Sequence, residues 1–164
     1  METDHGRAGR HAGYLAGATA VLVDDTWIVL TPTDVEPFDL APELDGFGVV
    51  TSDNPYAQNA QTLSPQENTE RRQRLRERFE EEYPQVHPTA GGTLRGEAGS
   101  WQDAEHGFAA RMSREEAAMH GAEHDQEAVY VIEGDTRLLI FADGEETIEQ
   151  HYRVTRYPRT ETTT

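Results

Sequence analysis

Short apolar stretches, most of them rich in β-branched and aromatic residues, alternate along the chain with turn-forming residues. Stretches of this kind predict β-strands. The predicted strands are the second half of 14–23, then 26–31, 46–51, 104–112, 128–132 and 137–141, with further candidates at 93–96 and 147–157. The Asp24-Asp25 pair and the Glu133-Gly134-Asp135 triplet are turn sequences, so the strands on either side of each are expected to form hairpins.

A helical pattern between Ser64 and Tyr83 predicts the longest helix of the chain. Ser64 is a favourable N-cap, Pro65 suits the first helical position, and Glu67 completes a capping box. Pro84 cannot continue the helix, so the end is marked as well.

A second capping-box signature at Ser113–Glu116 predicts a short helix over residues 114–120. We expect this helix to stop at Gly121, because glycine is typical of the position after a helix. Proline-containing connections are expected from Pro32 to the strand at Phe47 and from Pro84 to Gly92.

Together these elements predict an α+β fold: one mostly antiparallel, twisted sheet of about five or six strands with one long and one short helix packed on it. The 164 residues suffice for a single domain, expected over 13–157 between flexible tails at 1–12 and 158–164. The apolar positions of the long helix should face the sheet, so five residues are expected to be buried together. They are Val49, Leu75, Phe79, Val131 and Leu139.

Two polar residues, Asn68 and Arg71, extend the apolar stripe of Leu75 and Phe79 toward the start of the long helix. Upstream, Asn54-Pro55 breaks the preceding strand. A buried amide or guanidinium needs hydrogen-bond partners, so one interpretation is structural: Asn68 holds a loop and Arg71 pairs with a carboxylate. The other is a polar pocket at the helix N-terminus in which Arg71 binds an anion.

The chain carries 31 acidic residues against 14 basic ones, all of them arginine, and its formal charge is −17. This charge disfavours binding to nucleic acid or to anionic membranes. It fits either a salt-rich cytoplasm or compositional drift, and the sequence does not separate the two. Because there is no cysteine, no apolar run approaching a membrane helix and no signal peptide at the start, we expect a soluble cytoplasmic protein.

Four short motifs occur in the order found in a known family. They are Thr51–Pro55, Asn68–Leu75, Trp101–Asp103 and Asp125–Val129. In these motifs the chain resembles a bacterial family known only as domain of unknown function 3293, over about residues 14–142. At Ser52, Asp103 and Asp125 the chain departs from the family pattern, which has alanine, glutamate and glycine there. The resemblance implies no activity, because none is assigned to the family, but it marks the same polar residues.

Six residues from these motifs are candidates for one binding site. They are Asn54, Asn68, Arg71, Trp101, Asp103 and Gln126. Amides read donor and acceptor patterns, arginine holds an anion, and tryptophan stacks on a planar ring. The set therefore suits a small polar or anionic ligand that is nucleotide-like or carboxylate-bearing. The alternative is that these residues are structural and join loops to the sheet.

Catalytic and metal-binding signatures are sparse. Asp103, Glu105 and His106 form a close acid–base cluster, and proton transfer there would require burial and shifted pKa values. His120 and His124 have the spacing of a helical metal-binding pair, but the predicted helix end between them would spoil that geometry. We therefore expect no metal site and no cofactor.

Three classes of function stay open. The first is a small-ligand-binding domain that uses the six candidate residues. The second is a protein-interaction module that uses the acidic surface, and the third is an enzyme that uses Asp103 or Glu105 as acid or base. A cleft at the candidate residues favours the first class, and a flat apolar patch rimmed by acidic residues favours the second. The oligomeric state is left open.

The acidic composition predicts that stability depends on salt. Like charges repel at low ionic strength and are screened at high ionic strength, so the melting temperature should rise as KCl is added. Thermal unfolding followed by circular dichroism from low to high KCl measures this dependence. A flat or falling curve would leave compositional drift as the explanation.

Overall fold

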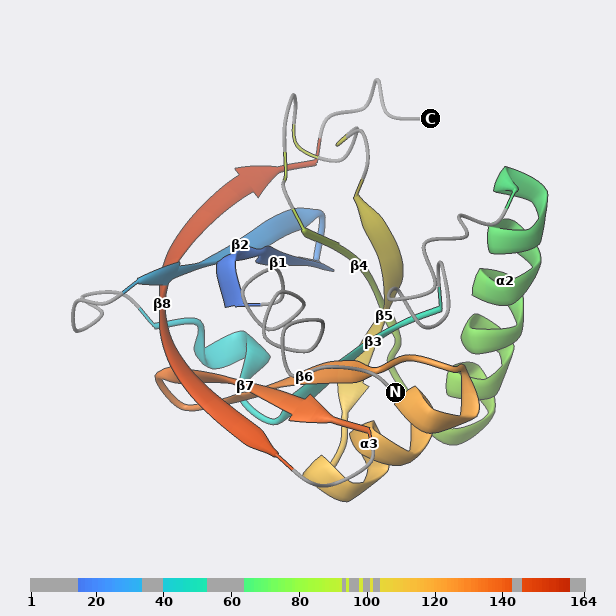
Figure 1. The fold of residues 1–164 in the computed structure, drawn as a ribbon. Coiled ribbons are helices and arrows are strands. Elements are labelled where there is room, and N and C mark those ends of the chain that lie inside the picture. The colour runs from blue at the N-terminus through green and yellow to red at the C-terminus, as the bar shows by residue number, and fades with distance from the viewer. Residues whose placement is uncertain are drawn as a thin grey trace.

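The computed structural model describes residues 15–33, 40–52, 64–92, 94, 98, 101, 104–142 and 146–159. In these residues eight strands form a closed antiparallel barrel, and two helices pack against its outside (Figure 1). The strands are β1 (Ala18–Val23), β2 (Thr26–Thr33), β3 (Phe47–Thr51), β4 (His87–Gly92), β5 (Glu105–Arg111), β6 (Ala128–Glu133), β7 (Thr136–Phe141) and β8 (Thr147–Pro158). The helices are α2 (Pro65–Glu82), α3 (Arg114–Glu123) and the short 3-10 helix η1 (Pro42–Leu44). None of the described helices is long and apolar enough to cross a membrane.

The order of strands around the barrel is β1-β2-β8-β7-β6-β3-β5-β4, and pairing of β1 with β4 closes it. The predicted α+β fold, an open sheet of about five or six strands, is therefore wrong. Two strands make the difference. β4 lies in a segment interpreted as a connection, and β8, a strand of 12 residues, is only a candidate by its pattern.

The composition of β4 explains why closure is hard to predict. Its sequence is His-Pro-Thr-Ala-Gly-Gly, and proline and glycine are depleted in strands. Its backbone nevertheless pairs on both sides, with Ala90 opposite Ala20 of β1 and Pro88 opposite Phe108 of β5. Tertiary pairing therefore decides the conformation of this segment. The predicted strand at 93–96 lies mostly outside the described residues.

The other predicted strands and both helices are present. Asp24 and Asp25 both have positive φ, 47° and 62°, as the two central residues of a type I′ turn require, so β1 and β2 form the predicted hairpin. The hairpin of β6 and β7 is confirmed as well. Complete capping boxes begin both helices, at Ser64 and at Ser113.

The end of α3 differs from the prediction, because Gly121 lies inside the helix and the last helical residue is Glu123. A Cβ at Gly121 would lie 2.6 Å from a methyl group of Val129 in β6, so this glycine allows α3 to approach the barrel closely. The helix ends in a Schellman motif, in which Gln126 N–H donates to the Gly121 carbonyl and Asp125 has a φ of 59°. Glycine is favoured at that position, which accounts for the glycine of the family pattern where this chain has Asp125.

The barrel wall divides the core into an inner and an outer part. All five predicted core residues are buried, but they do not form one cluster. Leu75, Phe79 and Val131 lie between the helices and the outer face of the barrel, whereas Val49 lies inside it. Leu139 also faces the interior, because both of its neighbours along β7 belong to the outer cluster and side chains alternate along a strand.

Two different layers cover the outside of the barrel. Helices α2 and α3 cover β3, β5, β6 and β7, and Figure 1 shows them on one side of the molecule. On β1, β2 and β4 a third apolar cluster takes their place, in which Trp101 packs with Trp27, Val29 and neighbouring alanines. The cleft and the groove described below lie at and beside this second layer.

A single cation occupies part of the described barrel interior. Arg137 of β7 is 1% exposed, and its guanidinium donates to the Gly17 carbonyl at 2.6 Å and to the Thr19 hydroxyl at 2.9 Å. It also donates to the side-chain carbonyl of Gln150 at 2.7 Å, and it lies 4.4 Å from the ring centroid of Tyr130. Arg137 thus joins the segment before β1 to β7 and β8.

Candidate functional site

Two of the six candidate residues, Arg71 and Gln126, meet beside the end of β3. The Arg71 guanidinium donates through Nε to the Ser52 carbonyl at 2.8 Å and through Nη2 to the His124 carbonyl. The same Nη2 lies 3.6 Å from a carboxylate oxygen of Asp125. Arg71 therefore links the start of α2 to β3 and to the turn after α3.

Gln126 completes this junction. Its Oε1 accepts from the Thr51 hydroxyl at 2.8 Å, and its Nε2 donates to the same His124 carbonyl at 3.3 Å. Asn68 lies half-buried one turn before Arg71 on α2, while Asn54 and Asp103 lie outside the described residues. The described contacts of Arg71 and Gln126 are mainly with backbone and internal side chains, which is the geometry of residues that hold segments together.

Trp101 lies elsewhere, in the wall of a cleft of about 230 Å³ between the barrel and α2. We call it the Trp–Arg cleft. Its described lining residues are Leu22, Trp27, Arg72, Pro88, Thr89, Trp101, His106, Gly107, Phe108 and Arg159. The rings of Trp27 and Trp101 meet edge to face, with centroids 5.0 Å apart and planes at 74°. Only 8% of Trp27 and 5% of Trp101 is exposed.

Basic side chains reach the Trp–Arg cleft from three elements. Arg72 lies on α2, His106 lies on β5, and Arg159 directly follows the end of β8. Arg159 also lies 3.8 Å from the carboxylate of Asp25, which is 85% exposed. A highly exposed pair of this kind contributes little in water.

Sequence reasoning missed Arg72, although a signal for it exists. Arg72 precedes Leu75 by three residues and Phe79 by seven, which is as good a helical spacing as that of Arg71. Two adjacent arginines thus flank one apolar stripe. One bonds to the loops at the end of β3 and the other lines the cleft.

The acid–base cluster predicted at Asp103, Glu105 and His106 is not assembled by the described residues. Side chains alternate along a strand, so Glu105 and His106 face opposite sides of β5. His106 lines the Trp–Arg cleft on the outside. Glu105 faces the interior, where burial raises the pKa of Tyr130 and the charge of Glu105 adds to that shift.

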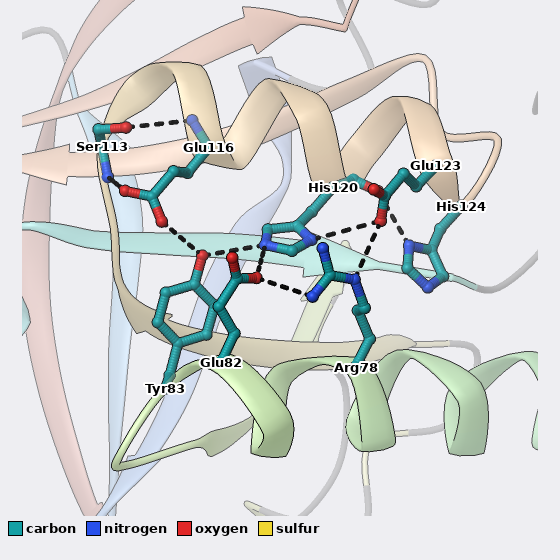
Figure 2. A network of polar contacts seen from close by, with 8 residues as sticks. All are labelled: Arg78, Glu82, Tyr83, Ser113, Glu116, His120, Glu123 and His124. Atoms are coloured by element: carbon teal, nitrogen blue, oxygen red, sulfur yellow. Dashed lines mark hydrogen bonds and ion pairs between the residues drawn. The ribbon is translucent and has the colours of Figure 1, made fainter.

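A polar network joins the end of α2 to α3. Figure 2 shows side chains of both helices pointing toward one another across the contact. They are Arg78, Glu82 and Tyr83 at the end of α2, and Ser113, Glu116, His120, Glu123 and His124 along α3 and at its two caps. The network fastens the two helices together on the outside of the barrel.

Its central residue is His120, which is fully buried. The Tyr83 hydroxyl donates to Glu116 at 2.8 Å and lies 2.9 Å from His120 Nε2, so its oxygen is left to accept from that nitrogen. A Glu82 carboxylate oxygen lies 3.1 Å from the same nitrogen. Nε2 therefore carries the proton of the neutral ring. Nδ1 is buried without a described hydrogen-bond partner, 3.7 Å from a carboxylate oxygen of Glu123.

The environment of His120 favours its neutral form. Burial lowers the pKa of the imidazole, and the nearby charges of Glu82 and Glu123 oppose this shift without reversing it. The charges of Arg78 and His124 act in the same direction as burial. At neutral pH the ring at the centre of the network is therefore uncharged, and Arg78 forms ion pairs with Glu82 and Glu123 around it.

The two histidines proposed as a helical pair do not converge on a metal. His124 turns its Nδ1 to the carbonyl of His120, at 2.9 Å. Among the described residues no group of three potential ligands has the geometry of a metal site. The predicted helix end at Gly121 is wrong, because the helix continues to Glu123. The two rings nevertheless do not face one metal position, because the His124 ring bonds to the backbone.

The junction at Arg71 predicts an effect on stability. Arg71→Ala should lower the free energy of unfolding by about 3 kcal/mol, because the carbonyls of Ser52 and His124 both lose a donor. Arg74→Ala is the matched control, since Arg74 is exposed on the same helix and its loss changes the net charge equally. Urea unfolding of the two variants measures the difference. Equal, small effects would contradict the role of Arg71 in joining these segments.

The burial of His120 predicts a pH dependence. In the unfolded chain His120 takes up a proton at its ordinary pKa, whereas in the folded protein it does so only at a lower pH. The free energy of unfolding should therefore fall as the pH drops from 7 to 5. His120→Gln removes this titration and should show a smaller fall over the same range. Urea unfolding at pH 7 and pH 5 tests this, and equal falls in both proteins would refute it.

Comparison with known proteins finds one family that the chain is similar to. Residues 50–129 match the family described as protein of unknown function (DUF3293). All four motifs of the predicted resemblance lie inside this segment. No curated protein and no solved structure matches the chain. The resemblance is thus confirmed over residues 50–129, a shorter stretch than the predicted 14–142.

Proposed function

We propose that this protein binds a small carboxylate- or phosphate-bearing molecule in the Trp–Arg cleft. The observation that carries the proposal is the charge of the cleft. In a chain with 31 acidic and 14 basic residues, the described lining includes two arginines and a histidine and no acidic residue. Guanidinium groups pair with carboxylate and phosphate oxygens, so Arg72 and Arg159 suit a ligand with such a group.

The walls of the cleft limit the size and shape of this ligand. Its volume of about 230 Å³ is below the range of roughly 300–1,000 Å³ typical of sites for drug-sized molecules. Trp27 and Trp101 are already packed against each other and nearly buried, so they offer little open ring face. These limits favour a compact anion over a nucleotide-like ligand, which would need a stacking platform.

The proposal moves the site away from most of the six candidate residues. Trp101 lines the Trp–Arg cleft, whereas Arg71 and Gln126 bond to neighbouring segments. The acid–base alternative loses support, because Glu105 and His106 face opposite sides of β5. A cytoplasmic location is kept as part of the proposal.

Both tryptophans of the chain line the cleft, so its intrinsic fluorescence reports on binding there. Acetate, benzoate and inorganic phosphate are suitable probes, with affinities measured by calorimetry. Arg72→Gln should weaken binding by about tenfold or more, the effect of losing a hydrogen bond to a charged group. Arg74→Gln should leave binding unchanged, although it alters the net charge and the helix in the same way.

The control separates a specific site from bulk electrostatics. With a formal charge of −17, removal of any arginine makes the protein repel anions more strongly. Equal weakening by Arg72→Gln and Arg74→Gln would therefore mean that the cleft holds no site. Absence of binding by the unmodified protein to all three probes would refute the proposal outright.

A further inference from the structure

A second depression adjoins the Trp–Arg cleft. It is a groove of about 350 Å³ on the outside of β1, β2 and β8, and apolar side chains predominate in it. We call it the apolar groove. Its described lining residues are Ala16, Ala18, Val29, Thr31, Gly92, Leu94, Ala98, Trp101, Thr155 and Tyr157. None of them is an acidic or basic residue, and Thr31, Thr155 and Tyr157 add hydroxyl groups to the apolar side chains. The groove therefore suits an uncharged part of a ligand better than a second charged group.

The cleft and the groove are parts of one surface. Trp101 lines both of them. On β2, Trp27 lines the cleft and Val29 lines the groove, and two residues along one face of a strand are about 7 Å apart. Tyr157 and Thr155 of β8 pair with these two residues and extend the same surface. A short alkyl chain is therefore long enough to pass from the cleft into the groove.

We propose that the ligand of the Trp–Arg cleft is an amphiphilic carboxylate whose alkyl chain lies in the apolar groove. The carboxylate is held by Arg72 and Arg159, and the chain runs past Trp101 over Val29. This inference rests on the proposed function and names the class of ligand for the same site. The arginines of the cleft select the carboxylate by its charge, and burial of the alkyl chain in the groove supplies additional affinity.

The chain length of the ligand is the variable that tests this inference. Acetate, butanoate, hexanoate and octanoate share one head group, so differences among them report the groove. Each buried methylene should tighten binding about fourfold, which is the effect of removing it from water. Calorimetry gives the affinities, and tryptophan fluorescence confirms that the cleft is occupied.

A variant that fills the groove provides the second part of the test. Thr31 is exposed and lines the groove, so Thr31→Phe should occupy the space of the alkyl chain without disturbing the core. Octanoate should then bind about tenfold more weakly or worse, while acetate binding stays the same. Thr147→Phe is the control, because Thr147 is an exposed threonine of β8 outside the described groove lining. Thr155→Phe serves in place of Thr31→Phe if the melting temperature shows that the first variant does not fold.

The outcomes separate this inference from the proposed function. Affinity that rises with chain length and falls in Thr31→Phe supports both. Acetate and octanoate of equal affinity would overturn the amphiphilic ligand and leave the small-anion site standing. A rise with chain length that Thr31→Phe and Thr155→Phe do not affect would place the alkyl chain outside the groove and overturn the inference. Absence of binding by every carboxylate would overturn this inference together with the carboxylate ligand of the proposed function.

Discussion

Closure of the sheet through the β1–β4 pairing is the constraint on which the rest of the structure depends. Once the barrel is closed, the strands have an inner face that packs on the barrel core and an outer face on which a second layer can pack. Inside, Arg137 is retained because the Gly17 carbonyl, Thr19 and Gln150 supply acceptors for its guanidinium. An unpartnered arginine there would cost several kcal/mol.

The outer face is covered in two ways, and the difference explains where the cleft and groove lie. Two capped helices cover β3, β5, β6 and β7, and their side chains interlock around Phe79 and His120. On β1, β2 and β4 the described cover comes largely from Trp101 and a few small residues. Helices pack with few gaps because their side chains fill grooves between neighbouring turns. A single large side chain covers less of a sheet than a helix does, and Trp101 lines a depression on each side.

Sequence reasoning succeeded where local physics decides the structure and failed where pairing at long range decides it. The capping boxes at Ser64 and Ser113 and the Asp24-Asp25 turn depend on neighbours within a few residues, and all are confirmed. β4 forms because two other strands flank it, which no local pattern shows. The predicted helix end at Gly121 is wrong because of another long-range contact. A glycine is needed there, inside α3, because Val129 of β6 leaves no room for a side chain.

The candidate site shows the same boundary between local and long-range information. Helical spacing identifies the stripe that continues from Leu75 toward the start of α2, but it does not say which of two adjacent arginines faces which neighbour. The direction of each arginine side chain depends on where the barrel strands lie relative to α2. Arg71 points toward the loop after β3, and Arg72 points toward the cleft beside β5. The described contacts of Trp101 do not include Arg71, because Trp101 packs in the apolar cluster over β1 and β2.

At several positions the structure explains why the chain has arginine and not lysine. Arg71 bonds to carbonyls from two segments through different nitrogens, and Arg137 reaches several acceptors at once. An ammonium group is a single point on a flexible chain and cannot span such separated acceptors. At these positions arginine is therefore required by geometry, whatever drives the composition elsewhere. The same planar group, in Arg72, suits the head of a carboxylate.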